Sequence, residues 1–166
     1  MKKTVGLVLL VLSVSAAPVL ARRSAPPAPA TAPPFTLPGR SGTVTYPGVA
    51  GKVVYVDFWA SWCGPCRQSF PWLKTLHERY AAQGLAIVAI NLDKERDAAQ
   101  AFLEDFPAPF LVAFDPSGHT AEAFHVTTMP SSYLLGADGT ILHSVAGFDP
   151  GETAAVEQKI SEELSR

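Results

Sequence analysis

The two cysteines of this 166-residue chain, Cys63 and Cys66, stand three positions apart. A disulfide between them closes too small a loop to hold a fold together. Two thiolates are also too few for a four-thiolate zinc site, and the four histidines are scattered singly, without the spacing of metal ligands. We therefore expect the pair to carry out thiol chemistry rather than to act as a scaffold or a metal centre.

Both cysteines lie where a strand pattern gives way to a helix pattern. Val53 to Trp59 is an apolar, β-branched run broken only by Asp57, which is typical of a strand buried on both faces. Pro65 suits the start of a helix. Unpaired N–H groups and the positive dipole end at a helix start favour a thiolate and lower the pKa of its thiol. We predict that Cys63 is the exposed nucleophile and that Cys66, one turn into the helix, resolves the mixed disulfide.

The elements that must position this pair follow from the periodicity of the remaining sequence. An irregular lead-in with short β segments is expected over 35–49, strands over 53–59, 85–92, 110–114, 131–136 and 140–146, and helices from 65 to about 80, around 99–106, near 119–125 and over 153–165. Ala137-Asp138-Gly139 is a hairpin signal between the last two strands. This order predicts an α/β domain with a mixed sheet and helices on both sides.

The N-terminus has the pattern of an export signal. Lys2 and Lys3 precede an uncharged apolar run that ends before Ala21, which predicts a signal peptide over 1–21. An uncleaved membrane anchor is the alternative, although the run is short for a span. Residues 22–34 hold five prolines and four alanines and are expected to form a linker, so the domain covers 35–166. Export places the protein in a periplasmic or other extracytoplasmic, oxidising compartment.

The charge balance excludes a general nucleic-acid binder. The chain has 13 basic and 15 acidic residues and a formal net charge of −2. Removal of Lys2 and Lys3 with the signal leaves 11 basic residues, so the mature chain carries about −4. No basic excess remains to neutralise phosphates.

The segment from Val56 to Cys66, VDFWASWCGPC, closely resembles the active-site strand and loop of thioredoxins. The leader, the lead-in over 35–49 and the extra helix near 95–106 are similar to the TlpA/ResA/CcmG branch of exported thiol-disulfide reductases. The resemblance covers about residues 35–166. It implies a thioredoxin fold, a mixed central β-sheet flanked by helices, with an N-terminal β extension and an extra helix insertion.

The same resemblance implies a substrate-binding surface around the cysteines. Pro130 falls where the family has a cis-proline that faces the CxxC motif, and the backbone of Met129 would pair with an extended substrate. Trp62, Gly64 and Pro65 of the motif would line the same surface. An ordinary trans-proline turn before a strand is the alternative for Pro130.

Asp57 matches the buried aspartate beneath the thioredoxin motif. Burial should raise the pKa of its carboxyl, which could then exchange a proton with Cys66. A structural aspartate bonded to backbone is the alternative. Two features depart from the family. Ala89 stands where thioredoxins carry a lysine, and no glutamate falls cleanly after the second strand, where Asp93 or Glu95 are either substitutes or solvated loop charges.

These features predict an exported thiol-disulfide oxidoreductase that reduces protein disulfides. The resemblance implies protein substrates, as in cytochrome c or copper-site maturation, and a membrane thiol donor. We expect a monomer whose only redox group is the Cys63–Cys66 pair, without a separate cofactor. A disulfide-donating oxidase and a thiol-based metallochaperone are the alternatives. A peroxiredoxin is excluded, because Val56 and Ala60 stand where that family needs proline and threonine or serine.

Overall fold

The computed structural model describes residues 30–166, so the predicted signal peptide and most of the predicted linker lie outside the described residues. The described chain contains seven strands and four α-helices, in the order β1 (Phe35–Pro38), β2 (Thr43–Tyr46), β3 (Val53–Trp59), α1 (Cys66–Tyr80), β4 (Leu85–Asn91), α2 (Arg96–Asp105), β5 (Leu111–Phe114), α3 (His119–Ala123), β6 (Ser131–Leu135), β7 (Ile141–Ala146) and α4 (Thr153–Leu164). Short 3₁₀ turns follow α1 and precede α4. Every element that the sequence predicts is present, with shifts of a few residues at the ends.

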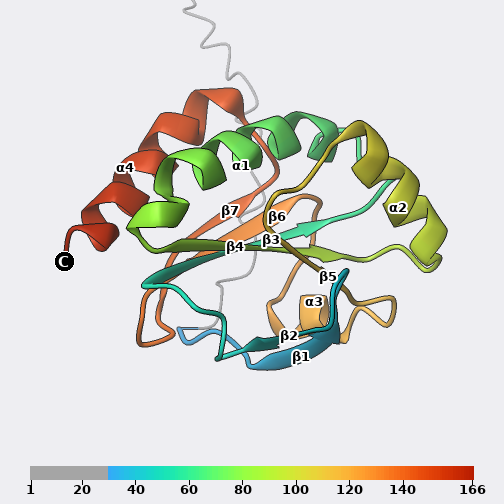
Figure 1. The fold of residues 1–166 in the computed structure, drawn as a ribbon, viewed down its shortest axis with the longest axis horizontal. Coiled ribbons are helices and arrows are strands. Elements are labelled where there is room, and N and C mark those ends of the chain that lie inside the picture. The colour runs from blue at the N-terminus through green and yellow to red at the C-terminus, as the bar shows by residue number, and fades with distance from the viewer. Residues whose placement is uncertain (1–29) are drawn as a thin grey trace, which may run out of the picture.

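A five-stranded mixed sheet, in the order β5-β4-β3-β6-β7, forms the centre of the molecule (Figure 1). The central strand β3 is parallel to β4 and antiparallel to β6, so both of its edges are paired. All seven residues of β3 are buried, which is what its unbroken apolar pattern predicts. The predicted mixed sheet is confirmed.

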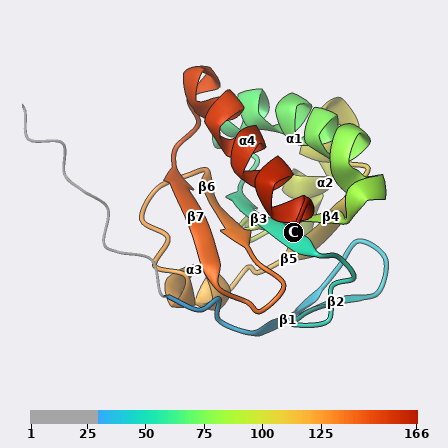
Figure 2. The ribbon, with the colours of Figure 1, turned by 90° about the vertical axis from the view of Figure 1, so that its left-hand side faces the viewer.

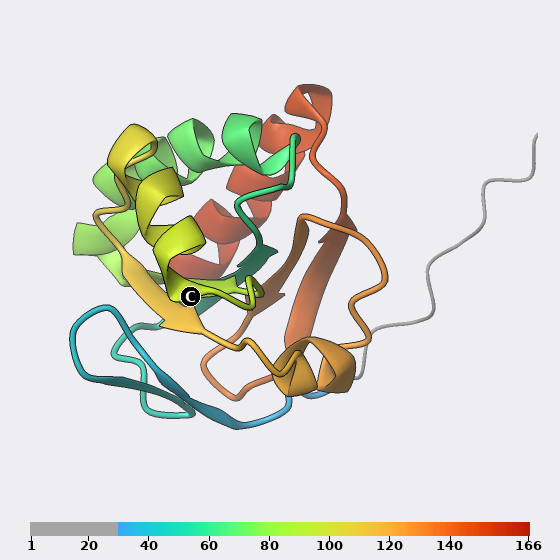
Figure 3. The same cartoon turned by 90° about the vertical axis from the view of Figure 1, so that its right-hand side faces the viewer.

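Alternating side chains of β3 divide the core into two clusters. Tyr55 and Trp59 pack with buried residues of α1, α2 and α4, whereas Val56 and Phe58 pack with α3 and the β1–β2 pair. Figures 1 and 2 show α1 and α4 over one face of the sheet, with α3, β1 and β2 on the other. Figure 3 shows α2, the inserted helix, on the α1 side. The predicted placement of helices on both sides is therefore confirmed.

The described chain already packs against the domain before residue 35. Thr31 forms an antiparallel bridge with Thr140, and the Ala32 N–H donates to the Gly139 carbonyl at 2.9 Å. Ala32 itself is buried. Proline and alanine content alone predicts an extended segment here, and the exposed backbone at the β6–β7 hairpin gives this segment its partners. In residues 30–166 no helix is both long and apolar enough to cross a bilayer.

Candidate active site

The two cysteines form a disulfide at the N-terminus of α1, whose N-cap is Pro65. The Cys66 N–H donates to the Cys63 sulfur across 3.2 Å. Pro65 has no N–H to leave unpaired in this first turn. When the disulfide is reduced, the same N–H and the helix dipole are placed to stabilise a Cys63 thiolate.

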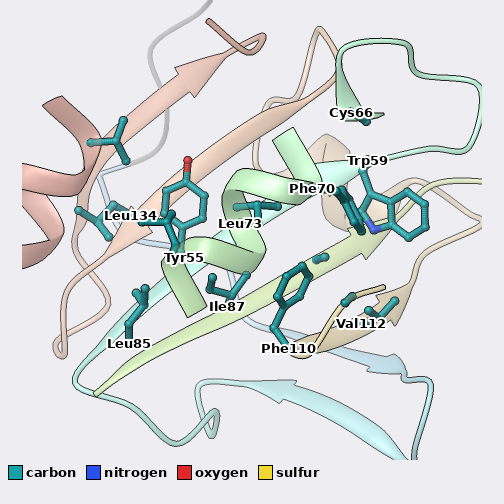
Figure 4. Packing of buried hydrophobic residues seen from close by; sticks show 14 of the residues in the cluster. Tyr55, Trp59, Cys66, Phe70, Leu73, Leu85, Ile87, Phe110, Val112 and Leu134 are labelled. Carbon is teal, nitrogen blue, oxygen red and sulfur yellow. The ribbon is translucent and has the colours of Figure 1, made fainter. Parts of the chain in front are cut away.

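The burial of the pair corrects one prediction. Cys63 is only 3% exposed, and Cys66 is fully buried. Figure 4 shows Cys66 near Trp59 and Phe70, two aromatic residues that are themselves buried. Cys63 lies on the loop side, as its position predicts, but the prediction that it is exposed is wrong for this disulfide form. The Cys63 sulfur is bonded to the sulfur of the fully buried Cys66, which accounts for its low exposure.

A surface groove with a volume of about 420 Å³ runs beside the disulfide. Cys63, Met129 and five further residues line it, namely Trp62, Gly64, Pro65, Thr127 and Thr128. The Met129–Pro130 peptide bond is cis, which confirms that prediction. Trp62 is 70% exposed, whereas large apolar side chains elsewhere in the described chain are mostly covered. The residues predicted to bind substrate thus lie together around Cys63, and Pro130 follows Met129 in the chain through the cis bond.

Asp57 is buried beneath the site, on the face of β3 that Tyr55 and Trp59 also share, and is 1% exposed. Desolvation raises the pKa of its carboxyl to about 7, and a hydrogen bond from Ser132 opposes that rise. The Ser132 hydroxyl donates to Oδ1 at 2.7 Å, and Oδ2 has no hydrogen-bond partner among the described residues. The predicted rise in pKa is confirmed. The bond to a side-chain hydroxyl also differs from the backbone-bonded alternative.

Asp93 holds the loop that carries the cysteines. Its carboxylate accepts hydrogen bonds from the Ser61 N–H and hydroxyl, each at 2.9 Å, and from the Asn91 amide at 2.7 Å. Asp93 is buried, so it is a structural anchor rather than a solvated loop charge. Glu95 is exposed and stands at the N-cap of α2 without a side-chain capping bond. The contact between Ser61 and Asp93 could not be predicted from the sequence. Its only signal there is a carboxylate that comes shortly after a buried strand.

A disulfide at a helix N-terminus, a cis-proline beside it and a mixed sheet beneath it define the class of thioredoxin-fold redox proteins. The family model described as Redoxin matches residues 27–160. The chain therefore belongs to the Redoxin family.

Three similar proteins carry names of thiol-disulfide exchange proteins. The thiol-disulfide oxidoreductase ResA of Bacillus subtilis is 29% identical over 117 residues, 70% of this chain and 65% of that protein. The thiol:disulfide interchange protein CycY of Rhizobium leguminosarum is 41% identical over 130 residues, 77% of this chain and 66% of that protein. A crystal structure of a thiol:disulfide interchange protein DsbE from Chlorobium tepidum has 46% identity and a TM-score of 0.80, covering 83% of this chain and 98% of that one.

These similarities confirm the resemblance to the TlpA/ResA/CcmG type of thioredoxin-fold protein and the predicted fold class. The matched region spans less than two thirds of the Bacillus subtilis protein. The similarity therefore shows the family and the fold.

Proposed function

We propose that the protein is an extracytoplasmic thiol-disulfide oxidoreductase that reduces disulfide bonds in other proteins. The observation that carries this proposal is the Cys63–Cys66 pair at the start of α1, with the Cys66 N–H on the Cys63 sulfur. The three similar proteins described above are named as thiol-disulfide oxidoreductases or interchange proteins, which supports the same activity. The groove beside Cys63 gives an extended substrate chain a place to lie.

The proposed cycle moves two electrons from the enzyme to the substrate. The Cys63 thiolate attacks one sulfur of a substrate disulfide, forming a mixed disulfide and releasing the first substrate thiolate. The Cys66 thiol gives its proton to the Asp57 carboxylate. The Cys66 thiolate then attacks the Cys63 sulfur, which closes the enzyme disulfide and releases the second substrate thiolate. Asp57 suits this transfer because its pKa of about 7 allows it to hold or lose a proton near neutral pH.

The predicted export signal and the family support the proposed location and partners. An enzyme disulfide in an oxidising compartment needs a source of electrons, and we propose a membrane thiol donor for that role. Protein disulfides of cytochrome c or copper-site maturation are the proposed substrates. We propose that the protein acts as a monomer, with the cysteine pair as its only redox group.

Trapping the mixed disulfide tests the proposed roles of the two cysteines. Cys66→Ser keeps the attacking thiol and removes the resolving one, so partner proteins should accumulate on Cys63 when the variant is expressed in its native host. Cys63→Ser is the matched control and should trap nothing. Partners found on Cys66 in that control, and none on Cys63 in the first variant, would show that the roles are reversed.

Equilibration with glutathione buffers tests the direction of electron flow. A reductase is expected to have a midpoint near the thioredoxin value of about −270 mV, because both carry Gly-Pro between the cysteines. A midpoint near about −120 mV would instead identify a disulfide-donating oxidase. The metallochaperone alternative predicts copper or zinc retained after dialysis, with no reduction of insulin disulfides. Within residues 30–166 no group of three or more His, Cys, Asp or Glu side chains is placed to hold a metal ion.

A further inference from the structure

Ser132 is the sole side chain that hydrogen-bonds to Asp57 among the described residues. The two lie opposite each other where β6 pairs with β3, although they are 75 positions apart in the sequence. Both are buried, Ser132 at 5% exposed and Asp57 at 1%. A carboxyl group this deep in the protein must pass its proton through a neighbouring group to reach solvent. A hydroxyl can do so, because it accepts one proton while it donates another.

A small cavity adjoins Ser132 on the side away from the sheet centre. It has a volume of about 20 Å³, which is enough for one water molecule, given that about 10–15 Å³ suffices. Its lining combines buried and surface groups, including Tyr55, Ser132, Asp149, Glu152 and Thr153. The lining therefore joins the group that contacts Asp57 to the turn between β7 and α4, which carries exposed residues. The Ser132 and Tyr55 side chains and the polar residues of the turn are the lining groups with which a water molecule there could form hydrogen bonds.

Tyr55 forms the inner wall of this cavity. It is buried, and Figure 4 shows its hydroxyl pointing away from Leu85 and Ile87 of the apolar core. Burial and the nearby Asp57 carboxylate raise the pKa of Tyr55, so its hydroxyl remains protonated at neutral pH. A side-chain hydrogen bond with Ser132 opposes that rise, so the Tyr55 hydroxyl lies beside the Ser132 hydroxyl where both line the cavity.

We propose that Ser132 and the cavity beside it form the route by which the Asp57 carboxyl exchanges its proton with solvent, an inference that rests on the redox cycle proposed above. While the Asp57 carboxylate is charged, the Ser132 hydroxyl donates to Oδ1. After Asp57 takes the proton of Cys66 on Oδ1, the Ser132 hydroxyl turns its hydrogen toward the cavity and its oxygen accepts the proton from Oδ1. Ser132 passes its own hydroxyl proton to the water in the cavity, and that water passes a proton on toward Glu152 and bulk solvent. One proton enters and one leaves at each step, and no bond between heavier atoms changes.

The surroundings of Asp57 leave few other routes. Ala89, its partner on β4, is fully buried and carries no polar side-chain atom. The face of β3 on which Asp57 lies packs toward α1, against a cluster of apolar side chains and the two cysteines. The charged groups on the cavity side are Asp149 and Glu152, and Tyr55 is the other titratable residue of β3 besides Asp57. Ser132 is thus a positioning and relay residue that acts through Asp57.

Titration of the Asp57 carboxyl by NMR in the oxidised protein provides the first test, and it needs no substrate. Ser132→Ala removes a hydrogen bond to the carboxylate, so the pKa of Asp57 should rise by about one to two pH units. Ser132→Thr keeps the hydroxyl and should restore it. Ser144→Ala, an exposed serine on β7, is the matched control and should leave the Asp57 titration unchanged. An Asp57 pKa that is the same in Ser132→Ala and in the control would overturn the proposal.

The second test measures how fast Cys66 resolves a mixed disulfide. The mixed disulfide is formed between Cys63 and a labelled peptide that contains one cysteine, and release of the peptide is followed. Ser132→Ala should slow release about tenfold or more, whereas Ser132→Thr should not. Val145→Ile adds one methyl group at the cavity wall and leaves less room for a water molecule. It should slow release and leave the Asp57 pKa unchanged. Normal release rates in both Ser132→Ala and Val145→Ile would overturn the route. Absence of any mixed disulfide in the wild type would instead count against the proposed function and would leave the Asp57 titration as an independent test.

Discussion

Replacing Asp57 by asparagine should change how the stability of the protein depends on pH. Burial raises the pKa of this carboxyl from 3.8 to about 7, so the folded state binds its proton more tightly than the unfolded state. The resulting stabilisation is complete below pH 4 and is lost as the pH rises through 7. At about 1.36 kcal/mol for each pH unit, the difference of about 3 units costs the wild type about 4 kcal/mol at pH 8. The asparagine side chain of the variant would be neutral throughout and would not lose this amount.

Urea unfolding of the oxidised proteins at pH 4.5 and pH 8 measures the effect. At pH 4.5 about 1 kcal/mol of this penalty is already present, because the unfolded carboxyl is mostly ionised there. The advantage of Asp57→Asn over the wild type in unfolding free energy should therefore grow by about 3 kcal/mol between pH 4.5 and pH 8. Because other groups titrate in the same range, the difference between the two proteins is the quantity to compare. Asp105→Asn removes an exposed carboxylate at the end of α2 and should show no such difference. Parallel pH profiles for Asp57→Asn and the wild type would refute the assignment of a raised pKa to Asp57.

Three further variants test the site and its support. Asp93→Ala leaves the Ser61 N–H and the Asn91 amide without their acceptor, so urea unfolding should show a loss of about 2–3 kcal/mol, and an unchanged midpoint would contradict the anchoring role. Trp62→Ala removes a side chain that is 70% exposed, so stability should stay within about 0.5 kcal/mol while KM for a disulfide-bonded peptide rises; an unchanged KM would remove Trp62 from the binding surface. Phe70→Ala opens the core beneath the disulfide and should cost about 3–5 kcal/mol in thermal or urea unfolding, and a loss below about 1 kcal/mol would show that the core refills.

Local sequence patterns predicted the fold well where burial and chain geometry act on neighbouring residues. The run from Val53 to Trp59 coincides with β3, because a strand buried on both faces needs an unbroken apolar sequence. Pro65 marked the start of α1, because its ring geometry fits that position and its missing N–H has no helical partner to lose. The buried state of Asp57 followed from the same local pattern, since a lone carboxylate in a buried strand has no exposed face available.

The contacts that shape the site could not be predicted, because they join residues far apart in the sequence. The bond from Ser132 to Asp57 depends on the register between β6 and β3, and a shift of one residue would turn Ser132 to the other face of the sheet. The anchoring of Ser61 by Asp93 depends in the same way on how two loops meet beyond the ends of β3 and β4. The burial of Cys63 depends on the disulfide itself, which draws its sulfur toward Cys66.

The neutral neighbours of Asp57 bear directly on its proposed chemistry. A lysine in place of Ala89 would set an ammonium group opposite the carboxylate, favour its charged form and lower its pKa. A carboxylate fixed in the charged form is a poor carrier, because it does not keep the proton that Cys66 must lose. With alanine on one side and the Ser132 hydroxyl on the other, burial is opposed by a single hydrogen bond, and the pKa settles at about 7. The absence of a charged side chain at these two strand positions therefore supports the proposed role, in which Asp57 takes up a proton and releases it within one cycle near neutral pH.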